Sequence, residues 1–214
     1  MIYEYPDREA SIRQGDIFAA LPRVEVSLGR IPVLENDEQL VAREWRDIAM
    51  DGEEVAAIFP LRPVVAIVAS QDCDASRARD ITLCEVRPFR DVERKSQETA
   101  SPKKWKNMLT QQARINQKWF YLPPDEGIGF NDKMAVDFMV TLRVPRAQLE
   151  TFRDLRKGRL NTLAYEHFRE RIGEFFRRYA YDEWYPLDGE ELKAYISEYP
   201  DTKPFPWQSW ASKE

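Results

Sequence analysis

Two carboxylates and a thiol follow an apolar run in the middle of the chain. Residues 64–69 read VVAIVA, and Asp72, Cys73 and Asp74 come just beyond them. Side chains of these types can form a hard-cation site, a reactive thiolate or an ordinary turn that ends a strand. Because flanking carboxylates raise the pKa of a thiol, Cys73 is expected to be a poor nucleophile.

A magnesium site in this region would take its ligands from Asp16, Asp72 and Asp74, which all lie near expected strand ends. Hard divalent cations prefer carboxylate oxygens and often keep several waters. In the alternative, the aspartates accept hydrogen bonds from backbone N–H groups and stop the strand, while Cys73 packs inward. Zinc is not expected, because two cysteines and one histidine fit no standard ligand spacing, and no other cofactor is predicted.

Basic side chains gather in the last third of the chain, where residues 143–178 contain ten of them. Arg143, Arg169 and Arg177 are candidates for binding a partner, since arginines beside aromatic rings can clamp nucleic acid. Equally, the aromatic stripe can be core with the arginine heads solvated at its edge. Trp207 and Trp210, in a proline-rich tail, either fold back on the domain or dock on a partner.

The composition limits the classes of partner. The 214 residues include 32 basic and 37 acidic side chains, which gives a net charge of −5. Generic polyanion binders are usually basic, so the chain is not expected to be one. Acidic residues are dense in 35–54 and 182–201, outside the basic stretch. Internal pairing of acids with bases therefore explains the charge pattern as well as nucleic-acid binding does.

A cytoplasmic location is expected. The N-terminal residues MIYEYPDREA lack the basic and then apolar pattern of a secretory leader. No apolar run approaches the roughly 20 residues of a spanning helix, so no membrane partner is expected either. Both cysteines are then expected to be reduced.

The elements that position these residues are strands in the first two thirds of the chain. Residues 64–69 are almost continuously apolar, which is typical of a strand covered on both faces, and they should pair with 81–86 through a loop at 75–80. Residues 135–144 alternate between apolar and polar side chains. Shorter strands are expected at 15–21, 24–28, 54–59 and 118–123.

Helices are expected in an insertion and in the last third. Pro102 follows a capping serine and opens a helix over about 101–116. A helix over 145–158 begins at a proline and ends at a glycine, and an amphipathic helix of about five turns follows Asn161. A short helix after Asp188 completes the prediction. The expected domains are a β domain at 1–144 and a helical lobe at 145–214, with the tail packed on it.

The order of these pieces resembles the PemK/MazF family. The matching pieces are RQGDIFAALP at 13–22, RPVVAIVASQD at 62–72 and VDFMVTLRVPRAQL at 136–149. Members of that family fold as an SH3-like barrel with a C-terminal helix, and they are toxins that cut single-stranded RNA under the control of an antitoxin. The resemblance implies an α+β fold, with a small SH3-like β-barrel, an inserted helix and a C-terminal helical lobe.

The same resemblance implies a catalytic pair. Arg62 matches the arginine of the family's Arg-Pro element, which stabilises the charged transition state of RNA cleavage, and Arg87 is available as a second cation. The family's hydroxyl position falls at 86–88, where this chain has no hydroxyl.

Two functions follow as expectations. The first is a bacterial interaction module that binds a protein or a nucleic acid, RNA rather than DNA, in a toxin–antitoxin or defence system. The second is a metal-independent endoribonuclease that uses Arg62 and Arg87. The sequence leaves open whether the protein is an enzyme.

Overall fold

The computed structural model describes residues 2–35, 39–52, 54–92 and 118–177, together with isolated positions at 101, 103, 193, 197 and 200. The chain divides into two compact units, residues 1–176 and 177–214. The fold described below is that of the first unit. Apart from these isolated positions, the helix predicted at 101–116, the helix predicted after Asp188 and the tail lie outside the described residues.

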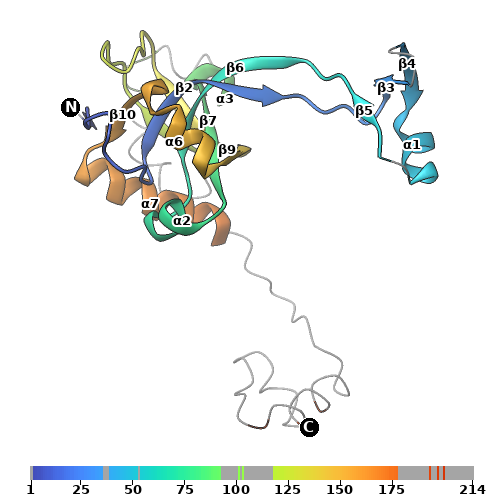
Figure 1. The fold of residues 1–214 in the computed structure, drawn as a ribbon. Coiled ribbons are helices and arrows are strands. Elements are labelled where there is room, and N and C mark those ends of the chain that lie inside the picture. The colour runs from blue at the N-terminus through green and yellow to red at the C-terminus, as the bar shows by residue number, and fades with distance from the viewer. Residues whose placement is uncertain are drawn as a thin grey trace. The chain divides into compact units, whose positions relative to one another are not determined.

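An antiparallel sheet of seven strands forms the body of the first unit (Figure 1). Its strand order is β1-β10-β2-β6-β7-β9-β8. The strands are β1 Tyr3–Glu4, β2 Asp16–Val24, β6 Leu61–Val68, β7 Asp80–Pro88, β8 Trp119–Leu122, β9 Met134–Pro145 and β10 Arg156–Leu160.

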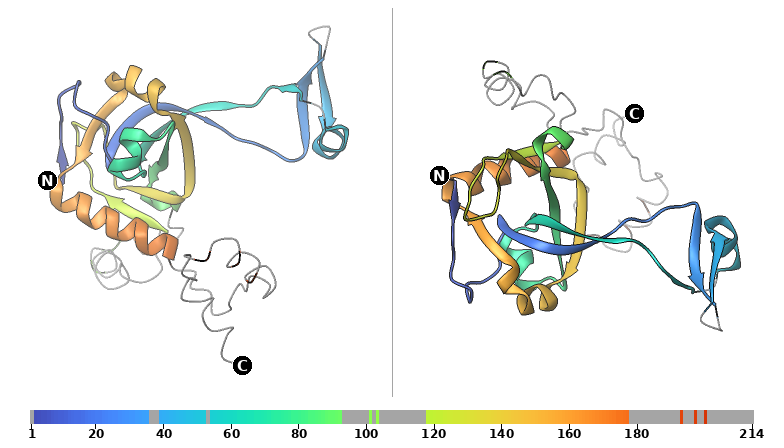
Figure 2. Two further views of the ribbon diagram at one scale, coloured as in Figure 1. Left: turned by 60° about the horizontal axis from the view of Figure 1, so that its bottom comes forward. Right: turned by 90° about the horizontal axis from the view of Figure 1, so that it is seen from above.

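This sheet is strongly curved in Figure 2. In the strand order, β1 and β8 stay at its two edges, so no sheet among the described residues closes into a barrel. The α+β class predicted from the sequence is confirmed, whereas the predicted small SH3-like β-barrel is not.

A second, three-stranded sheet is inserted between β2 and β6. It contains β3 Arg30–Leu34, β4 Leu40–Glu44 and β5 Ala56–Ala57 in the order β4-β3-β5, with helix α1 Trp45–Asp51 between β4 and β5. Its core consists of Ile31, Val33 and Ile48. The sequence analysis predicted no strand at 30–34 or 40–44 and no helix at 45–51.

Two helices cover the two faces of the large sheet. On one face, α7 Thr162–Arg177 packs Phe168, Ile172 and Phe175 against the strands. On the other, α6 Arg146–Thr151 contributes Leu149 to a second apolar cluster. The described residues of the unit also contain the short helices α2 Asp72–Arg77 and α3 Phe89–Val92 and the 3₁₀ turn η1 Arg153–Leu155. None of the helices in the described residues is long and apolar enough to cross a membrane.

The strongest sequence signals are confirmed. The strands predicted at 64–69 and 81–86 are β6 and β7, which are antiparallel neighbours. The alternating stretch 135–144 is β9. The amphipathic helix is α7, and the Asn161 side chain accepts a hydrogen bond of 3.0 Å from the backbone N–H of Ala164, as a helix cap does.

The helix predicted at 145–158 is wrong in its second half. Helix α6 ends at Thr151, and the chain then forms η1 and strand β10. The strand forms because Arg156 and Arg159 reach a buried carboxylate in β2, a long-range contact that local helix signals cannot reveal.

Three shorter predictions also need correction. Residues 24–28 are not a strand beyond Val24, and the strand predicted at 54–59 is reduced to β5. The first half of the loop predicted at 75–80 belongs to helix α2, which ends at Arg77. In each case the sequence pattern was short. Tertiary contacts rather than local preferences therefore determine the structure of the inserted sheet and of the turn after β6.

Candidate functional site

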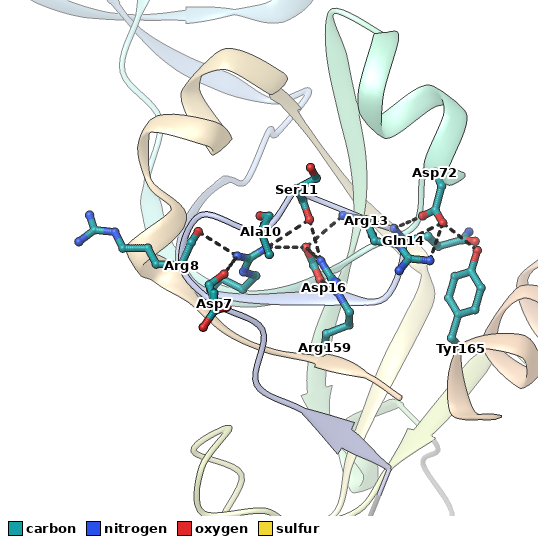
Figure 3. A network of polar contacts seen from close by, with 11 residues as sticks. Asp7, Arg8, Ala10, Ser11, Arg13, Gln14, Asp16, Asp72, Arg159 and Tyr165 are labelled. Carbon is teal, nitrogen blue, oxygen red and sulfur yellow. Dashed lines mark hydrogen bonds and ion pairs between the residues drawn. The ribbon is translucent and has the colours of Figure 1, made fainter. Parts of the chain in front are cut away.

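Two of the three predicted metal ligands, Asp16 and Asp72, lie in a polar network around the start of β2 (Figure 3). Asp16 is fully buried, and both of its carboxylate oxygens accept hydrogen bonds from arginine. Arg159 donates to both oxygens, and Arg156 Nη1 donates to Oδ2 over 3.1 Å. This is the environment of a structural ion pair rather than of an available cation ligand.

The two arginines also organise the loop before β2. Between them they donate to backbone carbonyl oxygens at distances from 2.7 to 3.4 Å. The accepting residues are Asp7, Arg8, Ala10 and Ser11. A buried charge thus fixes a loop that has no regular secondary structure of its own.

Asp72 ties together three parts of the chain that are distant in sequence. It accepts hydrogen bonds from Arg13 Nη2 over 3.2 Å, from the backbone N–H of Gln14 over 2.8 Å and from the Tyr165 hydroxyl over 3.2 Å. Burial, followed by the nearby Asp72 charge, raises the pKa of Tyr165, so this hydroxyl keeps its proton at neutral pH.

The stretch 70–74 therefore matches the turn alternative in part. The chain leaves β6 and begins α2 at Asp72, whose carboxylate is engaged in the contacts above. Cys73 does not pack inward as predicted, because it is exposed and Ala75 is the buried residue of this turn. Asp74 is exposed, and the described part of the chain has no group of three or more His, Cys, Asp or Glu side chains able to hold a metal ion.

A second polar cluster lies on the large sheet and contains the predicted catalytic residue Arg62. Its Nη2 donates to the two carboxylate oxygens of Glu85 over 2.8 and 3.2 Å, and its Nε donates to Glu25 over 3.0 Å. Arg23, directly opposite Arg62 in the register of β2 and β6, donates to the same Glu85 carboxylate. Like charges in opposite positions repel, so the buried Glu85 is what allows this pair of arginines.

Arg87 belongs to the same cluster. It lies two residues after Glu85 on β7, and alternation along a strand directs both side chains to one face. Arg87 Nη1 donates to Asp137 over 3.2 Å, and Asp137 is the register partner of Glu85 on β9. We call Arg23, Arg62 and Arg87, with the carboxylates Glu85 and Asp137, the arginine cluster.

The arginines of this cluster remain partly open to solvent. The exposed fractions of their side chains are 24% for Arg23, 43% for Arg62 and 33% for Arg87, whereas the Glu85 side chain is 2% exposed. The hydrogen bonds that Arg62 donates to Glu25 and Glu85 raise its pKa, so it stays charged at any accessible pH. Buried carboxylates thus orient guanidinium groups that can still receive an anion.

Aromatic side chains border the arginine cluster at the edge of the sheet. In the strand register, Trp119 lies opposite Asp137, and Tyr121 lies opposite Ala135, the register partner of Arg87. The Trp119 ring contacts Phe89 edge-on, with 4.7 Å between ring centroids. Tyr121 is only half-buried, so one aromatic ring next to the cluster reaches the surface.

Of the predicted binding residues, the two with described side chains form separate ion pairs. Arg143 pairs with Asp80 over 3.0 Å and is 77% exposed, while Arg169 pairs with Glu166 and lies over the Tyr165 ring. Arg177 is the last residue of α7, and its side chain is not described. Trp207 and Trp210 lie outside the described residues.

Internal pairing explains much of the basic stretch at 143–178. Its ion-paired members in the described residues are Arg143, Arg146, Arg153, Arg156, Arg159, Arg169 and Arg171. The acidic partners of these arginines among the described residues lie outside the acidic stretch 35–54.

Sequence reasoning missed Arg23, Glu85 and Asp137. Glu85 and Asp137 each interrupt an apolar strand, in ITLCEV and AVDFMV. A charged side chain among buried neighbours on a strand needs a partner of opposite charge. These two acidic residues within apolar strands were therefore the sequence signal from which the arginine cluster could have been predicted.

No protein-family model matches the chain, and no curated protein matches it.

Proposed function

We propose that the protein is a cytoplasmic binding module that holds single-stranded RNA at the arginine cluster. The observation that carries the proposal is the set of three arginines on adjacent strands, each oriented by a buried carboxylate and each still partly exposed. A guanidinium group matches the geometry of a phosphate, and one held in place loses less entropy on binding.

RNA is favoured over an acidic protein surface by the aromatic side chains beside the cluster. Single-stranded nucleic acids are bound by cationic grooves combined with aromatic rings on which bases stack. Tyr121 offers such a ring: it lies in line with Arg87 in the strand register, with Ala135 of β9 between them. The net charge of −5 does not oppose this mode of binding, because the cluster provides local positive donors.

The PemK/MazF resemblance is part of this proposal. Its three pieces correspond to β2, β6 and β9, and a curved antiparallel sheet with a C-terminal helix supports an SH3-like barrel in an opened form. On this proposal the protein acts in a bacterial toxin–antitoxin or defence system.

Binding of a fluorescein-labelled single-stranded RNA, measured by fluorescence anisotropy at several salt concentrations, tests the proposal. We expect Arg62→Gln and Arg87→Gln each to weaken binding about tenfold and to lower the slope of log K against log salt by about one. Arg143→Gln is the matched control, since Arg143 is exposed and lies outside the cluster. Absence of binding by the wild-type protein, or an equal loss in the control, would refute the proposal.

Endoribonuclease activity is a second candidate, favoured because the predicted pair Arg62 and Arg87 share one cluster. Two cations can stabilise the charged transition state of phosphodiester cleavage. The assay is cleavage of a panel of single-stranded RNAs in the presence of EDTA, with loss of cleavage in Arg62→Gln. If the panel stays intact, this candidate fails while the binding proposal stands.

A further inference from the structure

The inserted sheet has one packed face and one uncovered face. Ile31 and Val33 of β3 point to the packed face, where they contact Ile48 of α1. Pro32, which lies between them, and Leu34, which follows them, point to the opposite face, because side chains alternate along a strand. In the register, Pro32 lies opposite Ala42, and Leu34 lies opposite Leu40.

The uncovered face is apolar throughout its centre. Leu34 is also the register partner of Ala56, and Ile58 follows two residues later with its backbone N–H bonded to Pro32. We call this surface the open face, and its residues are Pro32, Leu34, Leu40, Ala42, Ala56 and Ile58. All six are exposed, including 57% of Leu40 and 51% of Ile58. The ion pair of Arg30 with Glu44 borders it.

Exposed apolar side chains are concentrated around this sheet. Among the described residues, fifteen large hydrophobic side chains are exposed, and ten of them lie between positions 24 and 61. A three-stranded sheet with three buried core residues leaves most of its apolar surface in water. Contiguous apolar surface of this kind marks a site where another protein binds.

The charge of the inserted segment indicates the partner. Residues 29–59 contain eight acidic and three basic side chains, a net charge of −5 that equals the net charge of the whole chain. A second copy would bring two acidic segments together. The segment 177–214 carries a net charge of −3, so the chain's own C-terminal part is not complementary either. A basic protein is complementary, and its association would be steered electrostatically.

We propose that the open face docks a basic protein partner, and that this site is separate from the arginine cluster. The partner contributes an apolar centre that covers Leu34 and Leu40, surrounded by Lys or Arg side chains that complement the net negative charge of residues 29–59. The proposal goes beyond the RNA-binding function and does not depend on it.

Site-specific photocrosslinking in the native host tests the proposal. The photoreactive residue p-benzoylphenylalanine replaces Leu40 in the full chain, with a matched control at Leu163 of α7, which is 70% exposed. We expect an adduct at position 40, absent at position 163, in which mass spectrometry identifies a second protein with a basic surface. A crosslink to a second copy, to 177–214 or to an acidic protein, or no adduct at all, overturns the proposal.

The purified pair then gives a quantitative test. Leu34→Asp should weaken binding of the identified protein at least tenfold, and Ala42→Arg, an exposed substitution that leaves the small core intact, should do the same. Binding should also weaken several-fold when salt is raised from 50 to 300 mM. Arg62→Gln should leave this affinity unchanged, so failure of the RNA proposal and failure of the docking proposal are distinguishable. Unchanged affinity in both open-face variants overturns the docking site.

Discussion

Asp16 shows how a residue suited to metal binding can serve the fold instead. Its carboxylate is fully buried between Arg156 and Arg159, which in turn bind the carbonyls of the loop before β2. A carboxylate in this position is needed for its charge, because both guanidinium groups are themselves largely buried. An aspartate at a strand end can thus have a structural role, and the sequence alone does not distinguish this role from metal binding.

Asp16→Asn should therefore destabilise the protein strongly. The amide keeps the shape of the side chain but leaves two buried arginines without a counter-charge, so we expect a loss of about 3–5 kcal/mol in the free energy of unfolding. Urea unfolding followed by circular dichroism measures this difference.

Asp74→Asn is the control for this experiment, since Asp74 is exposed and belongs to the same predicted metal trio. Its effect should stay within about 0.5 kcal/mol. Equal effects of the two substitutions would mean that the arginine pairs around Asp16 do not stabilise the fold.

At the scale of elements, β10 is the segment in which local preference and tertiary structure disagree most. The sequence from 145 onward favours a helix that ends at Gly158, yet Gly158 lies within a strand between β1 and β2. The glycine is required there by space: a Cβ atom would overlap Ile128 Cδ1 and lie 3.0 Å from the carbonyl oxygen of Glu4. The glycine that suggested the end of a helix is therefore explained by the close approach of two strands, β1 and β10.

Gly158→Val should lower stability by about 1–3 kcal/mol, because the added methyl groups must displace Ile128 or the backbone of β1. Thermal and urea unfolding measure the loss. Gly173→Ala in α7 is the matched control, since a Cβ at that position meets nothing within 4 Å. Alanine is the better helix former, so this control should gain about 0.5–1 kcal/mol. The close approach of β1 to β10 would be contradicted if valine at 158 were tolerated as well as alanine at 173.

At the scale of the first unit, the large sheet and the inserted sheet have separate hydrophobic cores. The core of the inserted sheet has no residue in common with the clusters that hold the large sheet to α6 and α7. Val24 and Leu61, at the two ends of the insertion, are direct partners in the register of β2 and β6. β2 and β6 are thus paired like the two strands of a β-hairpin up to the residues at which the insertion begins and ends.

Replacing residues 25–60 by an Asn-Gly turn should consequently leave the large sheet folded. A two-residue turn joins antiparallel partners of this kind, and we expect the thermal midpoint to shift by less than about 5 °C. Phe168→Ala is the contrasting variant, because Phe168 is fully buried between Phe120 and Phe138. Its loss of about 3–5 kcal/mol should lower the midpoint by about 10 °C. Unfolding of the shortened chain would show that the insertion supports the large sheet.

Several features of the fold could be predicted because they are encoded locally. The period of two in β9, the apolar run of β6 and the spacing of three and four in α7 each reflect burial of one face of a single element. The inserted sheet was missed because its strands are short and carry apolar residues on both faces, so the sequence shows no polar–apolar alternation although the burial in β3 alternates. Of the candidate site, Arg62 and Arg87 were identified, but Glu85 and Asp137, which orient them, were not.

The sequence by itself determined the α+β class, the main strands, the amphipathic helix and the acidic character of the insertion, since each depends on composition or on neighbours along the chain. Only the tertiary structure decided which charged side chains are buried in ion pairs and which remain exposed to solvent. It paired Asp16 with two arginines from positions 156 and 159, placed Arg23, Arg62 and Arg87 on one face, and left the apolar residues of the inserted sheet uncovered. Electrostatic pairing and burial act through space, and residues more than 100 positions apart meet only when the sheet has formed.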